Sequence, residues 1–96
     1  MENRDEIIEL YDLYSNLLTE KQRNYFEDYY YMDLSISEIA DNYSISRNGV
    51  YDQLKRVVDS LRKIEDGLKL KKRIDEIKKL DIDDEIKNKI IDILKE

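Results

Sequence analysis

An all-α fold is predicted by three features of this 96-residue sequence. It contains no proline and only two glycines, so the usual signals for loops and turns are scarce. Leu, Ile, Lys and Glu are abundant, and all are compatible with helices. The chain is 41% hydrophobic and 42% charged, a balance that allows a modest core and does not favour disorder. We therefore expect one small helical protein.

The first helix is expected from about Asp5 to Leu18. Its apolar side chains recur at spacings of three and four, which places them on one face. These side chains are Ile7, Leu10, Tyr11, Tyr14, Leu17 and Leu18. The opposite face is acidic, and the helix dipole favours negative charge near this end. It carries Glu2, Asp5, Glu6, Glu9 and Asp12.

Two capping boxes open the next two helices. In residues 19–22 and 35–38, a Thr or Ser is followed three positions later by Gln or Glu. The first side chain and the last can then satisfy each other's backbone amides. The boxes predict helices over 20–31 and 36–42. The inward positions are Tyr25, Phe26, Tyr29 and Tyr30 in the longer helix, and Ile36, Ile39 and Ala40 in the shorter one.

A long helix is predicted after a tight turn at 43–45, with Ser46 as its N-cap. Steps of four and three separate its apolar residues, as in a coiled-coil seam. The seam consists of Val50, Leu54, Val57, Leu61, Ile64 and Leu68. Beyond Gly67 the apolar residues change phase, so we expect the helix to break near this glycine.

Two shorter helices are expected to follow, over about 69–80 and 84–95. Leu70, Ile74 and Ile77 form the apolar set of the first helix. Asp81 or Asp83 would cap the second, in which we expect four side chains to face inward. These are Ile86, Ile90, Ile93 and Leu94. We accordingly divide the chain into a domain at 1–66 and a helical extension at 67–96, which packs on that domain or on a partner chain.

Residues 35–57 have the layout of a helix-turn-helix. A short capped helix containing the small Ala40 is followed by a turn with the apolar Ile45, which would fill the corner between the helices. The long helix, with its recognition part at about 47–66, would be held by Val50 and Leu54. Its other side would face the major groove or the flanking phosphates of a nucleic acid. The candidate contact residues are Ser46, Arg47, Asn48, Tyr51, Asp52, Lys55 and Arg56.

This part of the chain resembles region four of bacterial sigma factors. The resemblance is carried by LTEKQR at 18–23, LSISEIA at 34–40 and ISR at 45–47, with Val50, Leu54 and Arg56. Together with the acidic first helix, YYYMDLS at 29–35, Tyr51-Asp52 and the lysine-rich tail, it is similar to the YlxM-like proteins. That resemblance implies a DNA-binding protein associated with the signal recognition particle protein. Two positions depart from the pattern, since related sequences usually carry Gly where Ser44 stands and Ala where Gly49 stands.

Net charge opposes nucleic-acid binding at first sight, because the chain carries −6. The sign changes along the sequence, however. Residues 1–46 carry a balance of −8, residues 47–80 a balance of +5, and residues 81–96 a balance of −3. Since charges are screened over about 8–10 Å at moderate salt, the local sign matters more than the total. The recognition helix and its extension are basic within an acidic protein.

Catalysis, metal binding and membrane insertion find no support in the composition. The chain has neither Cys nor His, which excludes the familiar zinc sites, disulfides and cysteine or histidine catalysis. No glycine-rich phosphate loop and no apolar run of about 20 residues is present. We expect a cytoplasmic, non-enzymatic protein without a cofactor.

Two functions therefore remain under consideration. The first is a regulatory nucleic-acid-binding protein whose partners are DNA or RNA, with the signal recognition particle protein or RNA implied by the resemblance. The second is a protein-interaction module that docks a basic partner through the acidic first helix. Several features have two interpretations: the tyrosines are core residues or stack on bases, and the lysine-rich run is a solvated face or tracks phosphates. The apolar seam supports a homodimer, or it is covered by the C-terminal helices.

Overall fold

The computed structural model describes residues 3–95 and confirms the predicted all-α fold. Within these residues it contains six α-helices, one 3₁₀ turn and no strand. The elements are α1 (Arg4–Tyr14), η1 (Ser15–Leu17), α2 (Glu20–Tyr30), α3 (Ile36–Tyr43), α4 (Arg47–Leu68), α5 (Leu70–Lys78) and α6 (Asp84–Lys95). No helix in this range combines the length and the apolar character needed to cross a bilayer. Glu2, assigned above to the acidic face, lies outside the described residues.

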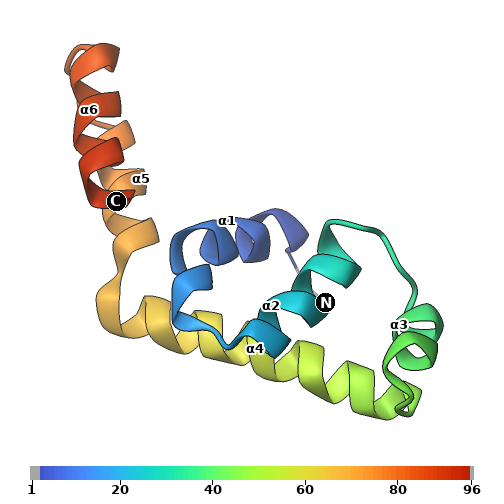
Figure 1. Cartoon of the computed structure of the whole chain (residues 1–96). Coiled ribbons are helices and arrows are strands. Elements are labelled where there is room, and N and C mark those ends of the chain that lie inside the picture. The colour runs from blue at the N-terminus through green and yellow to red at the C-terminus, as the bar shows by residue number, and fades with distance from the viewer. Residues whose placement is uncertain (1–2, 96) are drawn as a thin grey trace.

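The long helix α4 is the spine of the molecule, as Figure 1 shows. Helices α1, α2 and α3 all pack on it, with α3 near its N-terminal end. Helices α5 and α6 form a hairpin that projects from its C-terminal end, and α6 runs back along α5. The molecule is elongated as a result, with extents of 51 × 24 × 23 Å.

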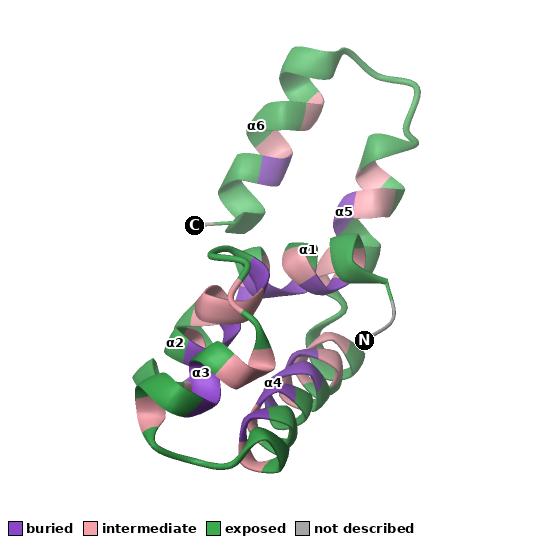
Figure 2. Ribbon diagram, turned by 90° about the vertical axis from the view of Figure 1, so that its right-hand side faces the viewer, coloured by how far each residue is buried: buried purple, intermediate pink, exposed green. Residues whose placement is uncertain are grey.

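The core consists of two adjoining clusters, and Figure 2 shows the buried residues on the sides of the helices that face one another. One cluster joins α1 and α2 to the second half of α4, around Phe26 and Leu61, which are both fully buried. The other joins α2 and α3 to the first half of α4, around Ile39, Val50 and Leu54. Each such side chain stabilises the fold by roughly 1.5–3 kcal/mol. The second cluster holds the helix-turn-helix together.

The three predicted N-caps are confirmed. The Gln22 amide donates to Thr19 Oγ1 at 3.1 Å, and the Glu38 amide donates to Ser35 Oγ at 3.1 Å. Both capping boxes are complete, because Gln22 and Glu38 each accept from the backbone amide of their cap. The third cap, Ser46, accepts from the Gly49 amide at 3.0 Å. Each cap contributes about 1 kcal/mol. Because each bond joins residues only three positions apart, these helix starts could be predicted from local hydrogen bonding alone.

The predicted inward positions of Leu17 and Leu68 are wrong. Leu17 is 62% exposed because α1 ends at Tyr14 and residues 15–17 continue as the tighter 3₁₀ turn η1, which takes Leu17 out of phase with the buried face. Leu68 is 53% exposed because α4 extends beyond the helices that pack on its seam. The predicted break at Gly67 is displaced as well: the helix continues through Gly67, and Lys69 adopts the left-handed conformation with φ 58°.

The predicted inner face of α6 is also wrong in part. Ile86 and Ile93 are 52% and 70% exposed, and Leu94 is exposed at 36%. The residue of α6 that is buried is Ile91, whereas Ile90 is half-buried. The phase differs because α6 packs mainly on the short helix α5, and this narrow contact leaves Ile86, Ile93 and Leu94 exposed. The cap of α6 is Asp83, whose carboxylate accepts from the Glu85 amide at 2.7 Å.

Glu65 and Tyr14 fix the direction of the hairpin. Lys69 is the N-cap residue of α5, but its side chain makes no capping hydrogen bond. Instead Glu65 accepts from the amides of Lys71 and Lys72 at 3.0 and 3.1 Å. The Tyr14 hydroxyl accepts from the Leu70 amide at 3.1 Å and donates to Glu65 at 2.5 Å. Side chains from α4 and α1 therefore satisfy the first amides of α5.

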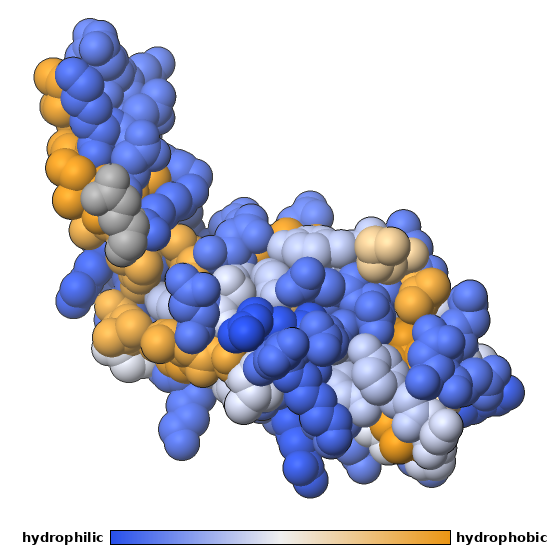
Figure 3. Space-filling model, viewed as in Figure 1, coloured by the Kyte–Doolittle hydropathy of each residue, from blue (hydrophilic) through white to orange (hydrophobic). Residues whose placement is uncertain are grey.

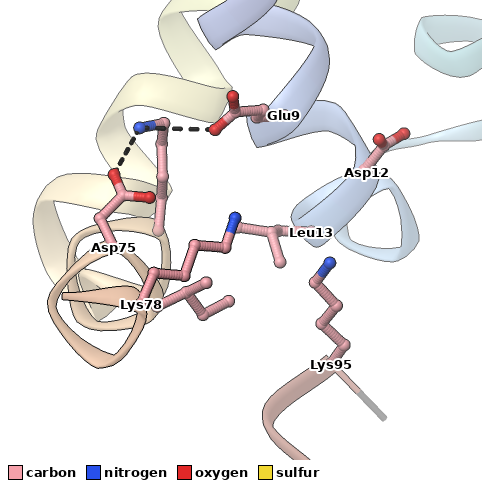
Figure 4. Close-up of a pocket in the computed structure, with 8 residues that line it drawn as sticks. Glu9, Asp12, Leu13, Asp75, Lys78 and Lys95 are labelled. Atoms are coloured by element: carbon pink, nitrogen blue, oxygen red, sulfur yellow. Dashed lines mark hydrogen bonds and ion pairs between the residues drawn. The ribbon is translucent and has the colours of Figure 1, made fainter. Parts of the chain in front are cut away.

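A second contact ties α5 to α1, shown in Figure 4. The Lys71 ammonium lies 2.8 Å from Asp75 on its own helix and 3.5 Å from Glu9 on α1. These carboxylates raise the pKa of Lys71, and the hydrogen bond that Lys71 donates to Asp75 is the largest cause. Lys78 and Lys95 extend toward the same pocket of about 180 Å³ between the hairpin and α1. The base of the hairpin is thus held by both hydrogen bonds and ion pairs.

Candidate nucleic-acid interface

The turn between α3 and α4 is closed by a left-handed residue. Ser44 has φ 56° and ψ 43°, so the serine occupies a conformation that normally favours glycine. The chain then returns toward α3, with the Ile45 amide donating to the Ala40 carbonyl at 3.1 Å. Ala40 is only 5% exposed, and its small side chain allows α4 to cross closely. The first turn of α4 therefore begins directly beside α3.

Ile45 fills the corner between the helices less completely than predicted. Its side chain is 38% exposed. A Cβ added at Gly49 would lie 3.6 Å from Ile45 Cδ1 and 3.2 Å from Ser46 Oγ. The isoleucine therefore lies over the first turn of α4 beside this glycine and outside the enclosed core. The helix pair is instead held by Ile39, Val50 and the other members of the second cluster.

The candidate contact residues lie at the N-cap and along the N-terminal half of α4, and all are exposed. Positions 47, 51 and 55 follow at steps of four, and so do 48, 52 and 56, so the residues form two adjacent rows. Tyr51 is 51% exposed, although it is a large aromatic side chain. The structure brings these seven residues together on one continuous surface.

A groove of about 570 Å³ runs between this surface and the N-terminus of α3. Its lining from α4 includes Arg47, Asn48 and Tyr51, which were predicted contacts. The other predicted residues do not line it. The opposite wall was not predicted from the sequence and consists of Tyr29, Ser35, Ile36 and Ser37. The capping box at 35–38 could have indicated this wall, because it fixes where α3 begins.

The tyrosines divide between the two interpretations given above. Tyr25 and Tyr30 are buried and belong to the core. Tyr31 is 45% exposed, and its hydroxyl donates to Asp12 at 2.9 Å. Tyr29 packs partly against both core clusters, yet it also lines the groove. Among these four side chains, Tyr29 has the position from which it could contact a ligand in the groove.

The cationic groups on the exposed surface have no partner within the described part of the chain. The side chains of Arg47, Lys55 and Arg56 form neither an ion pair nor a hydrogen bond there. By contrast, Arg4 pairs with Asp33 at 3.3 Å and Arg62 pairs with Glu6 at 3.7 Å. The recognition half of α4 thus presents its positive charges to solvent.

Glu38 is an acidic residue of α3 that has a defined structural role. Its carboxylate accepts from the backbone amide of Ser35 at 3.0 Å, and this hydrogen bond is the main cause that lowers the pKa of Glu38. The group therefore stays ionised and serves as part of the cap. Over residues 3–95, no three Asp or Glu side chains gather closely enough to hold a metal ion.

The fold and this exposed surface define a helix-turn-helix protein. The chain belongs to the family described as "Putative helix-turn-helix protein, YlxM / p13 like" (UPF0122), whose model matches residues 1–96. The predicted resemblance to YlxM-like proteins is confirmed.

Several members of this family resemble the chain closely. It is 54% identical over 68 residues to a UPF0122 protein of Thermoanaerobacter pseudethanolicus, covering 71% of this chain and 58% of the relative. For a UPF0122 protein of Caldanaerobacter subterraneus, identity is 53% over 70 residues, with 73% and 60% covered. For one of Shouchella clausii it is 52% over 61 residues, with 64% and 56% covered. The chain thus spans less than two thirds of the length of these relatives.

Proposed function

We propose that this chain is a non-enzymatic protein that binds DNA or RNA through the N-terminal half of α4. One observation carries the proposal: Arg47, Lys55 and Arg56 are exposed and have no partner among residues 3–95, and they lie on a recognition helix that borders an open groove. Unpaired cations on such a helix match the phosphates that flank a groove of nucleic acid. No other described region combines a groove, a helix-turn-helix and free arginines.

Each residue of the interface has a distinct role in this proposal. Arg47 and Arg56 offer planar forks that can bind a phosphate or a guanine edge with two hydrogen bonds. Asn48 can bind an adenine edge in the same way, and Asp52 can accept from the amino group of cytosine. Tyr51 supplies an aromatic surface for a base or a thymine methyl group.

The overall charge of −6 does not prevent this interaction. Two acidic residues of α1, Glu6 and Glu9, have basic partners within the chain, Arg62 and Lys71. Screening over about 8–10 Å confines the influence of the remaining carboxylates. The basic surface of α4 therefore acts locally, and its affinity for nucleic acid depends steeply on salt.

The resemblance to YlxM-like proteins supports a finer version of the proposal. In that version the protein acts in the cytoplasm as a regulator, and its target is the RNA or protein of the signal recognition particle, or DNA. The competing hypothesis, docking of a basic protein through the acidic face of α1, has less support. Glu6 and Glu9 are engaged in ion pairs, and Asp12 accepts a hydrogen bond from Tyr31. These carboxylates contribute to folding and leave a smaller free acidic surface.

The test compares two triple variants by fluorescence anisotropy with labelled DNA duplexes, hairpin RNA and single strands over a range of salt concentrations. One variant combines Arg47→Ala, Lys55→Ala and Arg56→Ala. The matched control removes three exposed lysines elsewhere, Lys63→Ala with Lys78→Ala and Lys79→Ala. Both variants lose three positive charges, so total charge does not distinguish them.

The interface variant is expected to bind no nucleic acid measurably. If residual binding persists, the slope of log affinity against log salt should fall by about 0.9 for each DNA phosphate that the variant no longer neutralises. The control is expected to bind like the wild type. Equal affinity of the interface variant and the wild type would refute the proposal. The ligand bound most tightly by the wild type identifies the class of nucleic acid, with signal recognition particle RNA included among the probes.

A further inference from the structure

Tyr51 differs from the other tyrosines of this chain because neither its ring nor its hydroxyl has a partner. The sequence contains eight tyrosines. Seven of them form a hydrogen bond through the hydroxyl or a ring contact with another aromatic side chain, namely Tyr11, Tyr14, Tyr25, Tyr29, Tyr30, Tyr31 and Tyr43. Tyr51 forms neither with any of residues 3–95, and it is 51% exposed. The packing of the fold therefore does not account for an aromatic side chain at this position.

The groove beside Tyr51 has the size of a small-molecule site. Its volume of about 570 Å³ lies within the range of roughly 300–1,000 Å³ that is usual for such sites. The opposite wall contributes Tyr29 and Ile36, so the lining combines two tyrosines and an isoleucine with polar side chains. No carboxylate is among the described residues that line it. The groove can therefore hold a flat ring that is attached to a negatively charged group.

Unpaired cations lie on the same row of α4 as Tyr51. Arg47 is one turn before it and Lys55 is one turn after it, and the helix rises about 6 Å over the four residues of each step. Neither cation has a partner within the described part of the chain, and Arg47 also lines the groove. In a nucleic-acid strand each internal base lies between two phosphates. An aromatic ring with a positive charge on either side therefore matches a base and its backbone together.

The surroundings of the groove do not resemble a surface for a protein partner. On the face drawn in Figure 3, hydrophobic surface is concentrated on the hairpin and the adjoining part of α4, whereas the end of the molecule that contains α3 is mainly hydrophilic. Surfaces that bind other proteins commonly carry broad apolar patches. An exposed aromatic ring between cations is more typical of a site on which bases stack.

We propose that the groove binds an unpaired base of DNA or RNA, with one face of the base stacked on the Tyr51 ring. The inference rests on the proposed function, because it names the part of a nucleic acid that this interface selects. A base within a duplex is covered on both faces by its neighbours and presents only its edges, whereas an unpaired base can turn out of the strand. Asn48 lines the groove and can bind the edge of the stacked base, while Arg47 binds an adjacent phosphate.

The first test measures the binding of hairpin probes, each prepared as DNA and as RNA, by fluorescence anisotropy. One probe has a single bulged adenine, its control has an abasic residue at the same position, and a third probe has this position paired. The bulged and abasic probes carry the same number of phosphates, so only the base differs. The wild type is expected to bind the bulged adenine about tenfold or more tightly than the abasic and paired probes. Either sugar satisfies the inference, and the tighter of the two identifies the source of the base.

The second test uses Tyr51→Phe and Tyr51→Leu. Because the Tyr51 side chain is exposed and has no partner among residues 3–95, neither change should alter helix content or unfolding in urea. Tyr51→Phe keeps the aromatic face and should bind the bulged probe within about twofold of the wild type, whereas Tyr51→Leu should bind it about tenfold more weakly. Both variants should bind the abasic probe like the wild type, since that probe has no base to stack.

The outcomes separate this inference from the proposed function. Equal affinity of the wild type for the bulged, abasic and paired probes would overturn the inference and leave the proposed function intact. A Tyr51→Leu variant that keeps the preference for the bulged base would overturn the assignment to Tyr51. A wild type that binds none of the probes would refute the proposed function together with this inference.

Discussion

Glu65→Ala is expected to destabilise the protein by about 2–3 kcal/mol. The Glu65 carboxylate accepts from two amides of α5, at 3.0 and 3.1 Å, and from the Tyr14 hydroxyl at 2.5 Å. Loss of a capping acceptor costs about 1 kcal/mol, and loss of a hydrogen bond to a charged group costs about 1.5–3 kcal/mol. For a protein of this size, each kcal/mol lowers the melting temperature by about 4–8 °C.

The measurement is urea unfolding followed by circular dichroism, together with hydrogen exchange at the amides of Lys71 and Lys72. Glu76→Ala is the matched control, because the Glu76 side chain is exposed and has no partner in the described chain. Tyr14→Phe should share most of the loss with Glu65→Ala, so the double variant is less destabilised than the two single effects combined. If Glu65→Ala unfolds within about 0.5 kcal/mol of the control, the network does not hold the hairpin.

Three further outcomes are expected. Ser44→Gly should stabilise the protein by about 0.5–1 kcal/mol in urea unfolding, because it relieves a left-handed serine at φ 56° while increasing the entropy of the unfolded chain; a loss of stability would contradict this. Gly49→Ala should change stability by less than about 0.5 kcal/mol, since the gain in helix propensity is offset where its Cβ meets Ser46 Oγ at 3.2 Å; a clear gain would mean that the cap is not disturbed. Burial and the hydrogen bond to Asp28 raise the pKa of Tyr43 to about 12. Its contribution to stability is therefore complete below about pH 10 and is lost as the pH rises toward 12, so the alkaline loss of stability should be smaller in Tyr43→Phe.

Local hydrogen bonding made the helix starts and the helix-turn-helix predictable from sequence. Thr19, Ser35 and Ser46 each bond an amide within three residues, so no distant contact is needed to place them. The inner face of α4 up to Leu61 was equally predictable. Its apolar residues recur at spacings of three and four, and the other helices of the two core clusters bury the face that this spacing defines.

The predicted end of α4 is wrong because the position at which this helix ends depends on distant contacts. Lys69 adopts a left-handed conformation that costs a non-glycine about 1–2 kcal/mol. The following amides donate hydrogen bonds to Glu65 and Tyr14, which compensates for this cost, and Tyr14 is 56 residues away from Leu70 in sequence. The local preference of glycine therefore predicts a break at Gly67, whereas the chain turns at Lys69.

The faces of the C-terminal helices could not be predicted because periodicity identifies an apolar side without saying what covers it. Ile86 and Ile93 fit a helical apolar face, yet they are 52% and 70% exposed. The groove could not be predicted for a different reason, because its walls come from separate helices. Tyr29 and Ser35 line it across from α4, but only the folded chain brings α2, α3 and α4 together around that space.

The proposed function depends on where nucleic acid touches this protein. Titration of the isotopically labelled chain with its best-binding DNA or RNA, followed by amide chemical shifts, locates that surface residue by residue. We expect the largest changes between Ser46 and Arg56 and at Ser35 and Ser37 across the groove, with α6 unaffected. Changes confined to the hairpin, with the N-terminal half of α4 silent, would contradict the assignment of the interface.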